Sequence, residues 1–263
     1  MSNKVESSEL PVTEPTTTSL KEDYWSDTRR PLTSLLFLLP WIAIYEIGIL
    51  MLSQPGSNEL RNGADYWMRS LLALSGAGQI LLLPMLVIAI LLSWHLIRRY
   101  SWTIRIETQV GMLAESLLLA VALVAVGQLH HLLFVNFQTP DNDPRLLTIQ
   151  GPLTYAVSYI GAGIYEEVMF RLLLVPAAFG VFRIMELPSR WAAAMAAVST
   201  SFIFALAHHV GPAADAFNLF TFSFRAAAGI FFAAVFFIRG FGITVGCHAA
   251  YDLLVGVFVA TDV

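Results

Sequence analysis

Three charged side chains, Glu166, Glu167 and Arg171, lie within an apolar segment that is long enough to cross a membrane. A single charge at the centre of a bilayer costs about 2.5–3.5 kcal/mol even on the lenient insertion scales. The chain must therefore pair these charges or use them. That requirement limits how the remaining segments can pack around this one.

The composition is that of a membrane protein, with 57% hydrophobic and 13% charged residues in a chain of 263. Soluble domains carry roughly 25% charged residues. A net charge of -4 provides no basic surface for nucleic acid, so no nucleic-acid partner is expected. The single cysteine, Cys247, excludes an internal disulfide and any metal site built from several cysteines.

Seven apolar segments approach the roughly 20 residues that a helix needs to cross the hydrocarbon core. They are about Leu35–Leu52, Ala77–Ile97, Gln109–Phe134, Gly151–Val175, Trp191–His208, Phe217–Ile238 and Phe241–Ala260. A polar stretch, Ser53–Arg69, separates the first two and is expected near the interface. Strand-like alternation is absent, so we predict an all-α polytopic membrane helix bundle of about seven transmembrane helices.

The chain divides into three parts. Residues 1–28 are polar, lack the apolar centre of a signal peptide and are expected to form a disordered tail. Residues 29–145 hold three spans, and 146–263 hold the four that include the charged cluster. Ten Lys and Arg residues fall on the inner segments and three on the outer ones, which predicts a cytoplasmic N-terminus. A chain with no recognised targeting signal is expected in the bacterial inner membrane.

Glu167 and Arg171 are four residues apart and share a helix face, whereas Glu166 is turned about 100° away. We expect Arg171 to neutralise Glu167 and to leave Glu166 facing another partner. A buried ion pair that only fixes helix packing would explain Glu167 and Arg171 equally well.

Two later spans also carry ionisable groups. His208 ends an Ala-rich helix, and His248 and Asp252 are four residues apart. Taken singly, each could be a structural residue. The energetic cost of placing these groups in a membrane becomes tolerable if they meet in one polar cavity. In such a cavity a carboxylate and imidazoles can activate water. Glu46 and Glu115 also fall in spans but have no partner at helical spacing, so we interpret them as interfacial or packing residues.

These residues form three motifs. Residues 166–171 match EExxxR, residues 204–208, from Phe204 to His208, match FxxxH, and residues 248–252 match HxxxD. Their order over about 150–255 resembles the CAAX prenyl endopeptidase and bacteriocin-processing (CPBP, or Abi) family of intramembrane proteases. The resemblance implies hydrolysis of peptide bonds in membrane-anchored or hydrophobic protein substrates within the lipid bilayer.

By this resemblance, Glu166 activates a water molecule that His208 shares. His248 and position 252 stabilise the oxyanion, while Glu167, Arg171 and Phe204 support the site. An ionised aspartate cannot donate a hydrogen bond, so Asp252 is expected to orient His248, to be protonated or to bind metal. We favour a metal-free mechanism without cofactor. A zinc protease with Glu166, His208, His248 and Asp252 as ligands is the alternative.

Two other functional classes stay open, a proton-coupled transport protein and a non-catalytic membrane immunity or scaffold protein. The absence of an internal repeat weakens the transporter. The predicted boundaries also place His208 near the outer face, away from Glu166 and His248. We therefore expect Leu187–Ala197 to lie along the interface and the fifth span to begin later and extend past His208.

Overall fold

The computed structural model describes residues 24–52, 61–74, 76, 81–134, 151–211 and 214–259, and all regular structure within these residues is helical. The helices are α2 Pro31–Leu52, α3 Gly63–Leu74, α4 Leu82–Ile97, α5 Ile106–Phe134, α6 Pro152–Glu167, the π-helix η3 Val168–Leu174, α7 Val175–Ile184, α8 Ser189–Ala207, α9 Leu219–Arg239, α10 Phe241–Leu253 and the π-helix η4 Leu254–Val259. The predicted all-α bundle is confirmed.

Each of the seven predicted spans contains a helix. Among the described residues, α2, α5, α8 and α9 are long and apolar enough to cross a membrane, while α4 and the helix Phe241–Gly256 are shorter apolar helices. The fourth predicted span is α6, η3 and α7, which follow one another without a break. Residues 53–60 and 77–80, from the polar stretch and from the second predicted span, lie outside the described residues.

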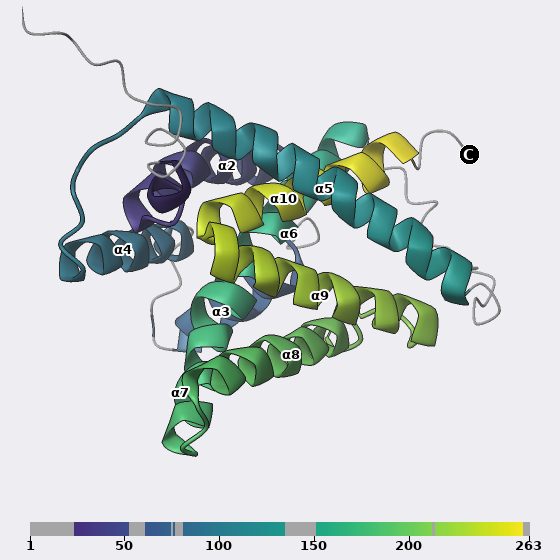
Figure 1. Ribbon diagram of the computed structural model, residues 1–263. Coiled ribbons are helices and arrows are strands. Elements are labelled where there is room, and N and C mark those ends of the chain that lie inside the picture. The colour runs from purple at the N-terminus through teal and green to yellow at the C-terminus, as the bar shows by residue number, and fades with distance from the viewer. Residues whose placement is uncertain are drawn as a thin grey trace, which may run out of the picture.

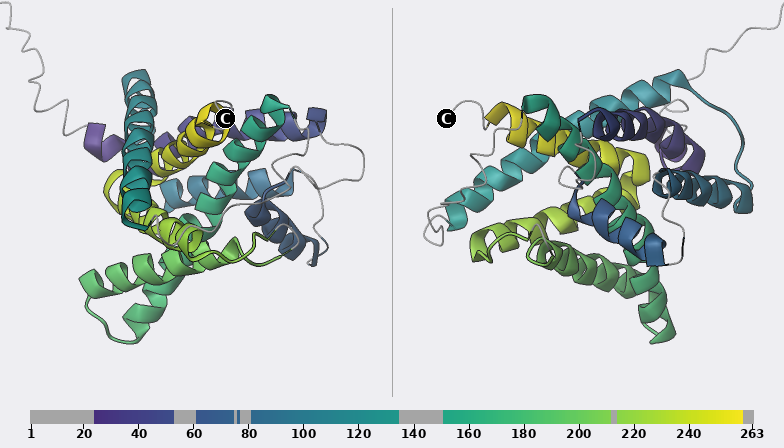
Figure 2. Two further views of the ribbon diagram at one scale, coloured as in Figure 1. Left: turned by 90° about the vertical axis from the view of Figure 1, so that its right-hand side faces the viewer. Right: turned by 180° about the vertical axis from the view of Figure 1, so that it is seen from behind.

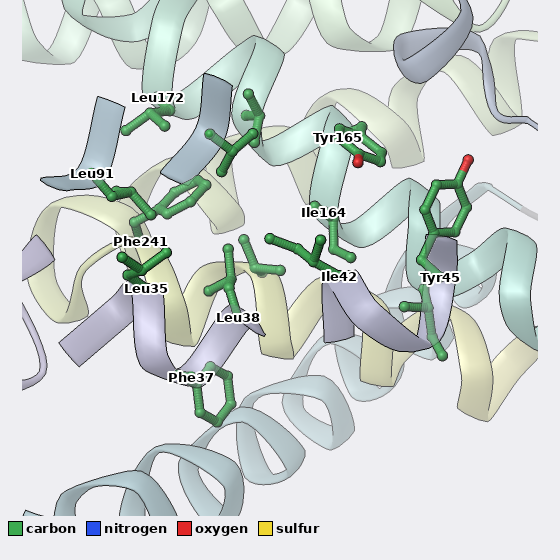
Figure 3. Close-up of a cluster of buried hydrophobic side chains, with 14 of the residues drawn as sticks. Leu35, Phe37, Leu38, Ile42, Tyr45, Leu91, Ile164, Tyr165, Leu172 and Phe241 are labelled. Carbon is green, nitrogen blue, oxygen red and sulfur yellow. The ribbon is translucent and has the colours of Figure 1, made fainter. Parts of the chain in front are cut away.

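Helix α10 lies at the centre of the bundle, and its first ten residues, 241–250, are all buried. It packs against α5, α6, α2 and α9, while α8 packs against α9 and α7 (Figure 1). The turn between α7 and α8 extends away from the other helices (Figure 2). The largest apolar core lies where α2, α4, α6 and α10 meet, with Leu38 and Ile42 facing Ile164 (Figure 3).

Glycines allow α10 to approach its neighbours closely. A Cβ on Gly163 of α6 would lie 2.6 Å from the backbone nitrogen of Ala249, and one on Gly246 would lie 2.5 Å from Ser116 Oγ of α5. Small residues at such contacts let helix backbones pack tightly in membranes. The contact at Gly163 brings α6 against α10 next to His248.

The expected course of the fifth span was wrong. Helix α8 begins at Ser189 and does not extend past His208. The error was to end the fourth span near Val175, because the helix continues to Ile184. Glu166 lies 18 residues before that end and His208 lies 19 residues after the start of α8, roughly 27–29 Å along each arm. The two side chains therefore reach the same level of the bundle without any interfacial segment.

Glu115, interpreted as an interfacial or packing residue, has partners that helical spacing could not reveal. Arg239 donates to it from Nε and Nη2, and the Tyr24 hydroxyl donates to Oε2 at 2.7 Å. The Arg239 guanidinium also lies 3.6 Å from the Trp25 ring centroid. Residues 24–27, assigned to the tail, form a helical turn at this cluster, and residues 1–23 lie outside the described part of the chain.

Replacing Gly163 with alanine is expected to lower the free energy of unfolding by about 1–3 kcal/mol, because the added methyl group meets backbone atoms that cannot move aside. Gly180→Ala is the matched control. It makes the same change on α7, with no heavy atom within 4 Å of the new methyl group, and should stabilise the protein by about 1 kcal/mol. Thermal unfolding of both variants in detergent would measure the difference. Equal shifts would contradict the close helix contact.

Candidate active site

The charged motif lies where α6 changes into the π-helix η3. The Val175 N–H bonds to the carbonyl of Phe170, five residues earlier, and Pro176 follows directly. Proline lacks an N–H, and its ring clashes with the carbonyl four residues before it, which disfavours an ordinary α turn here. Single π turns occur often at functional sites. No feature of the sequence pattern predicted this widened turn.

The predicted ion pair between Glu167 and Arg171 is present, with Nη1 lying 3.0 Å from Oε1. Both side chains are buried. Arg171 Nη2 donates to the carbonyl oxygen of Gly229 on α9 at 3.1 Å. The guanidinium also lies 4.7 Å from the ring centroid of Phe204 and 5.4 Å from that of Phe232, a favourable arrangement for a desolvated cation.

The same carboxylate holds His248. Glu167 Oε1 accepts a hydrogen bond from Nδ1 of the imidazole at 2.7 Å, and the ring stacks on Phe232 with 4.4 Å between centroids. The sequence suggested Asp252 as the residue that orients His248, but Asp252 Oδ2 lies 3.5 Å from the other nitrogen, Nε2. Sequence reasoning missed the bond to Glu167, because 81 residues separate its two partners.

Glu166 faces both imidazoles. Its Oε2 lies 3.8 Å from His208 Nε2 and 3.9 Å from His248 Nε2. Nδ1 of His208 bonds to the carbonyl oxygen of Phe204 at 2.9 Å, and a carbonyl can only accept. Nδ1 therefore carries the proton, and in a neutral ring the lone pair of Nε2 is directed at Glu166.

The structure brings together all four predicted catalytic residues, and they differ in exposure. The side chains of Glu166, His208 and Asp252 are 13%, 24% and 22% exposed, whereas that of His248 is 6% exposed. Behind them, Glu167 and Arg171 are closed off from solvent. His209, which matches no motif, bonds to the carbonyl oxygen of Asp215 in the segment after α8. The four predicted catalytic residues thus form a partly exposed surface, and a buried ion pair lies behind it.

Among the predicted zinc ligands, Glu166 lies farther from the two imidazoles than the ligands of a tetrahedral zinc site lie from one another, whereas His248 Nε2 and Asp252 Oδ2, 3.5 Å apart, are close to that spacing. Ligand atoms about 2.0–2.1 Å from zinc lie roughly 3.4 Å from one another. The separations of 3.8 and 3.9 Å between Glu166 Oε2 and the two imidazole nitrogens are larger. Within the described part of the chain, no group of three or more His, Cys, Asp or Glu residues could hold a metal ion.

Arg171→Met is expected to lower the free energy of unfolding by about 3–5 kcal/mol, because it leaves the buried Glu167 carboxylate without its cation. Combining it with Glu167→Gln should recover part of that loss. Arg183→Met, which removes an exposed arginine from the same run of helix, is the control and should cost less than about 1 kcal/mol. Thermal unfolding in detergent would measure all the variants. Additive losses in the double variant would contradict a direct pair.

Comparison with known proteins agrees with the three motifs. Residues 148–254 match the family described as Rce1-like, type II CAAX prenyl endopeptidase Rce1-like. Searches of curated proteins and of solved structures found no match to the chain. Four helices long and apolar enough to cross a bilayer mark an integral membrane protein. The motif-bearing part of this chain, residues 148–254, is therefore similar to the Rce1-like family of type II CAAX prenyl endopeptidases.

Proposed function

We propose that the protein is an intramembrane endopeptidase that uses Glu166 to activate water for attack on a peptide bond. The observation that carries this proposal is the position of Glu166 Oε2, which faces the Nε2 atoms of two imidazoles from two other helices at 3.8 and 3.9 Å. Separations of this length suit groups bridged by a shared water molecule. The substrates are membrane-anchored or hydrophobic proteins.

Glu166 and His208 are both hydrogen-bond acceptors toward such a water. The ionised carboxylate accepts one of its protons, and the unprotonated Nε2 of His208 accepts the other. A lone pair of the water oxygen is then directed away from both groups and toward the carbonyl carbon. As the oxygen–carbon bond forms, Glu166 takes the proton as general base. It returns that proton to the leaving nitrogen when the carbon–nitrogen bond breaks.

His248 is placed to stabilise the oxyanion. Glu167 lies at its Nδ1 and Asp252 at its Nε2, so each ring nitrogen has a carboxylate acceptor when the imidazolium forms. An imidazolium next to the reacting carbonyl stabilises negative charge as it develops. Asp252 is acceptor-only when ionised, so it acts through His248 and does not bind the oxyanion itself.

The setting of the enzyme is part of the proposal. The excess of Lys and Arg on the predicted inner segments supports a cytoplasmic N-terminus. A bacterial inner membrane is the location proposed for a chain of this kind. The substrates then reach the site from within the bilayer or from its surface.

Glu166→Gln is expected to lower the rate of peptide cleavage by about 100- to 10,000-fold, because the amide cannot act as a general base. Glu107→Gln makes the same change at an exposed position in the first turn of α5 and should leave cleavage unchanged. Proteomics of membrane-protein C-termini in cells that produce the wild type or either variant would identify the substrates. Peptides from those substrates would then give the rates. Full cleavage by Glu166→Gln would refute this mechanism.

Cleavage is also expected to survive incubation with a metal chelator, since the proposed base is a carboxylate that needs no bound metal. Metal analysis of the purified protein in parallel would show whether zinc binds. One zinc per chain, together with loss of activity on chelation, would replace the glutamate mechanism with the metalloprotease alternative.

A further inference from the structure

A second buried polar network lies outside the three motifs, where α2, α3 and α6 meet. Glu46 of α2 was interpreted as an interfacial or packing residue, and the structure shows that it has partners on two other helices. Its Oε1 accepts hydrogen bonds from Arg69 Nη2 at 2.7 Å and from the Tyr165 hydroxyl at 2.6 Å. Tyr165 directly precedes the proposed general base Glu166, so the network reaches the active site through the chain itself.

The network also anchors α3. Asp65, fully buried, accepts hydrogen bonds from Arg61 Nη1 at 2.7 Å, from Arg69 Nε at 2.5 Å and from the Tyr45 hydroxyl at 2.7 Å. Two carboxylates are thereby balanced by two guanidiniums. Buried networks whose members are well satisfied hold their surroundings in one arrangement. The anchored helix is only 12 residues long, so these bonds supply much of what fixes its place.

From this anchor, the network constrains the helix that carries Glu166. Tyr165 is fully buried, and its ring packs edge-on against Tyr45 with 5.4 Å between centroids (Figure 3). Gly161, one turn earlier, makes room for the Tyr45 ring, since a Cβ there would lie 2.0 Å from it. Adjacent residues on a helix differ by about 100°, so fixing the direction of Tyr165 also fixes that of Glu166.

Helix α3 also contacts the turn that follows His208. A Cβ on Gly211 would lie 3.3 Å from the indole of Trp67, so the α3 side chain packs directly on the backbone there. Gly211 has a φ of +106°, a conformation that favours glycine. One short helix therefore contacts the segments that carry both proposed water-binding residues.

We propose that the Glu46–Asp65 network is a positioning site for catalysis, which keeps Glu166 and His208 at the separation that lets both hold one water. This inference rests on the proposed function. Tyr165, Glu46 and Trp67 act through Glu166 and His208, and they touch neither the water nor the substrate. A displacement of about 1 Å at a reacting group can reduce rate by up to roughly 100-fold, so a small rotation of α6 is enough to matter.

Two matched variants separate positioning from simple anchoring. Tyr165→Phe and Tyr45→Phe each remove one hydroxyl from the same network, and both rings are fully buried. Their thermal stabilities should fall by similar amounts. Only Tyr165 lies beside Glu166, so Tyr165→Phe is expected to lower kcat by about 10- to 100-fold with little change in KM. Tyr45→Phe, which removes a hydroxyl that binds Asp65 and does not contact Glu46, should lower kcat less.

A second pair tests the contact with the turn after His208. Trp67→Ala is expected to lower kcat, while Leu71→Ala, at an exposed position on the same helix, should not. Rescue provides another readout that a merely structural role would not give. Glu46→Gln keeps an oxygen that can accept from Tyr165 and should retain a higher kcat than Glu46→Ala.

Measuring Glu166→Gln in the same assay distinguishes a failure of the proposed function from a failure of the positioning role. If Glu166→Gln cleaves normally, both the proposed function and the positioning role are lost. If Glu166→Gln is inactive but Tyr165→Phe lowers kcat no more than Tyr45→Phe does, and Trp67→Ala no more than Leu71→Ala does, the positioning role alone is overturned.

Discussion

The structure depends on one carboxylate, Glu167, which forms an ion pair with Arg171 and accepts a hydrogen bond from His248 inside an apolar bundle. Arg171 approaches it from the same helix and His248 from α10, and Arg171 also binds the carbonyl of Gly229 on α9. Three helices are thereby joined at a point where a bilayer offers no water to replace a lost partner. The energetic cost of burying these groups makes their arrangement specific, because an alternative packing would leave a buried charge without a partner.

That ion pair gives the two adjacent glutamates of the motif different surroundings. Glu167 and Arg171 are buried and paired with each other, whereas Glu166 lies one residue earlier and stays partly exposed beside two imidazoles. Adjacent glutamates on a helix face different environments, and this lets one be structural while the other remains available for chemistry. In the second network, Glu46 and Asp65 are likewise buried carboxylates with partners on other helices, and tyrosine hydroxyls are among their donors.

Helical periodicity and hydropathy were enough to predict a helix in each of the seven apolar segments and the pair Glu167–Arg171, because both depend on residues near one another in sequence. The bonds from Glu167 to His248 and from Glu115 to Arg239 were missed, since their partners lie on other helices far along the chain. The predicted height of His208 in the bundle was wrong because the end of the preceding helix was misplaced. The fourth span was predicted to end near Val175, but the helix continues through the π turn and Pro176 to Ile184.

The hairpin formed by α7 and α8 has a consequence for how the chain can vary in length. Glu166 and His208 lie nearly the same number of residues from its turn, so the equal lengths of the two arms bring the side chains to the same height in the bundle. Residues added within the turn leave both side chains at the same level. Removing a single residue from α8 would swing His208 by about 100° and draw it back by about 1.5 Å. Length variation in this protein is therefore tolerable at the turn, and within the arms only when both change by whole helical turns.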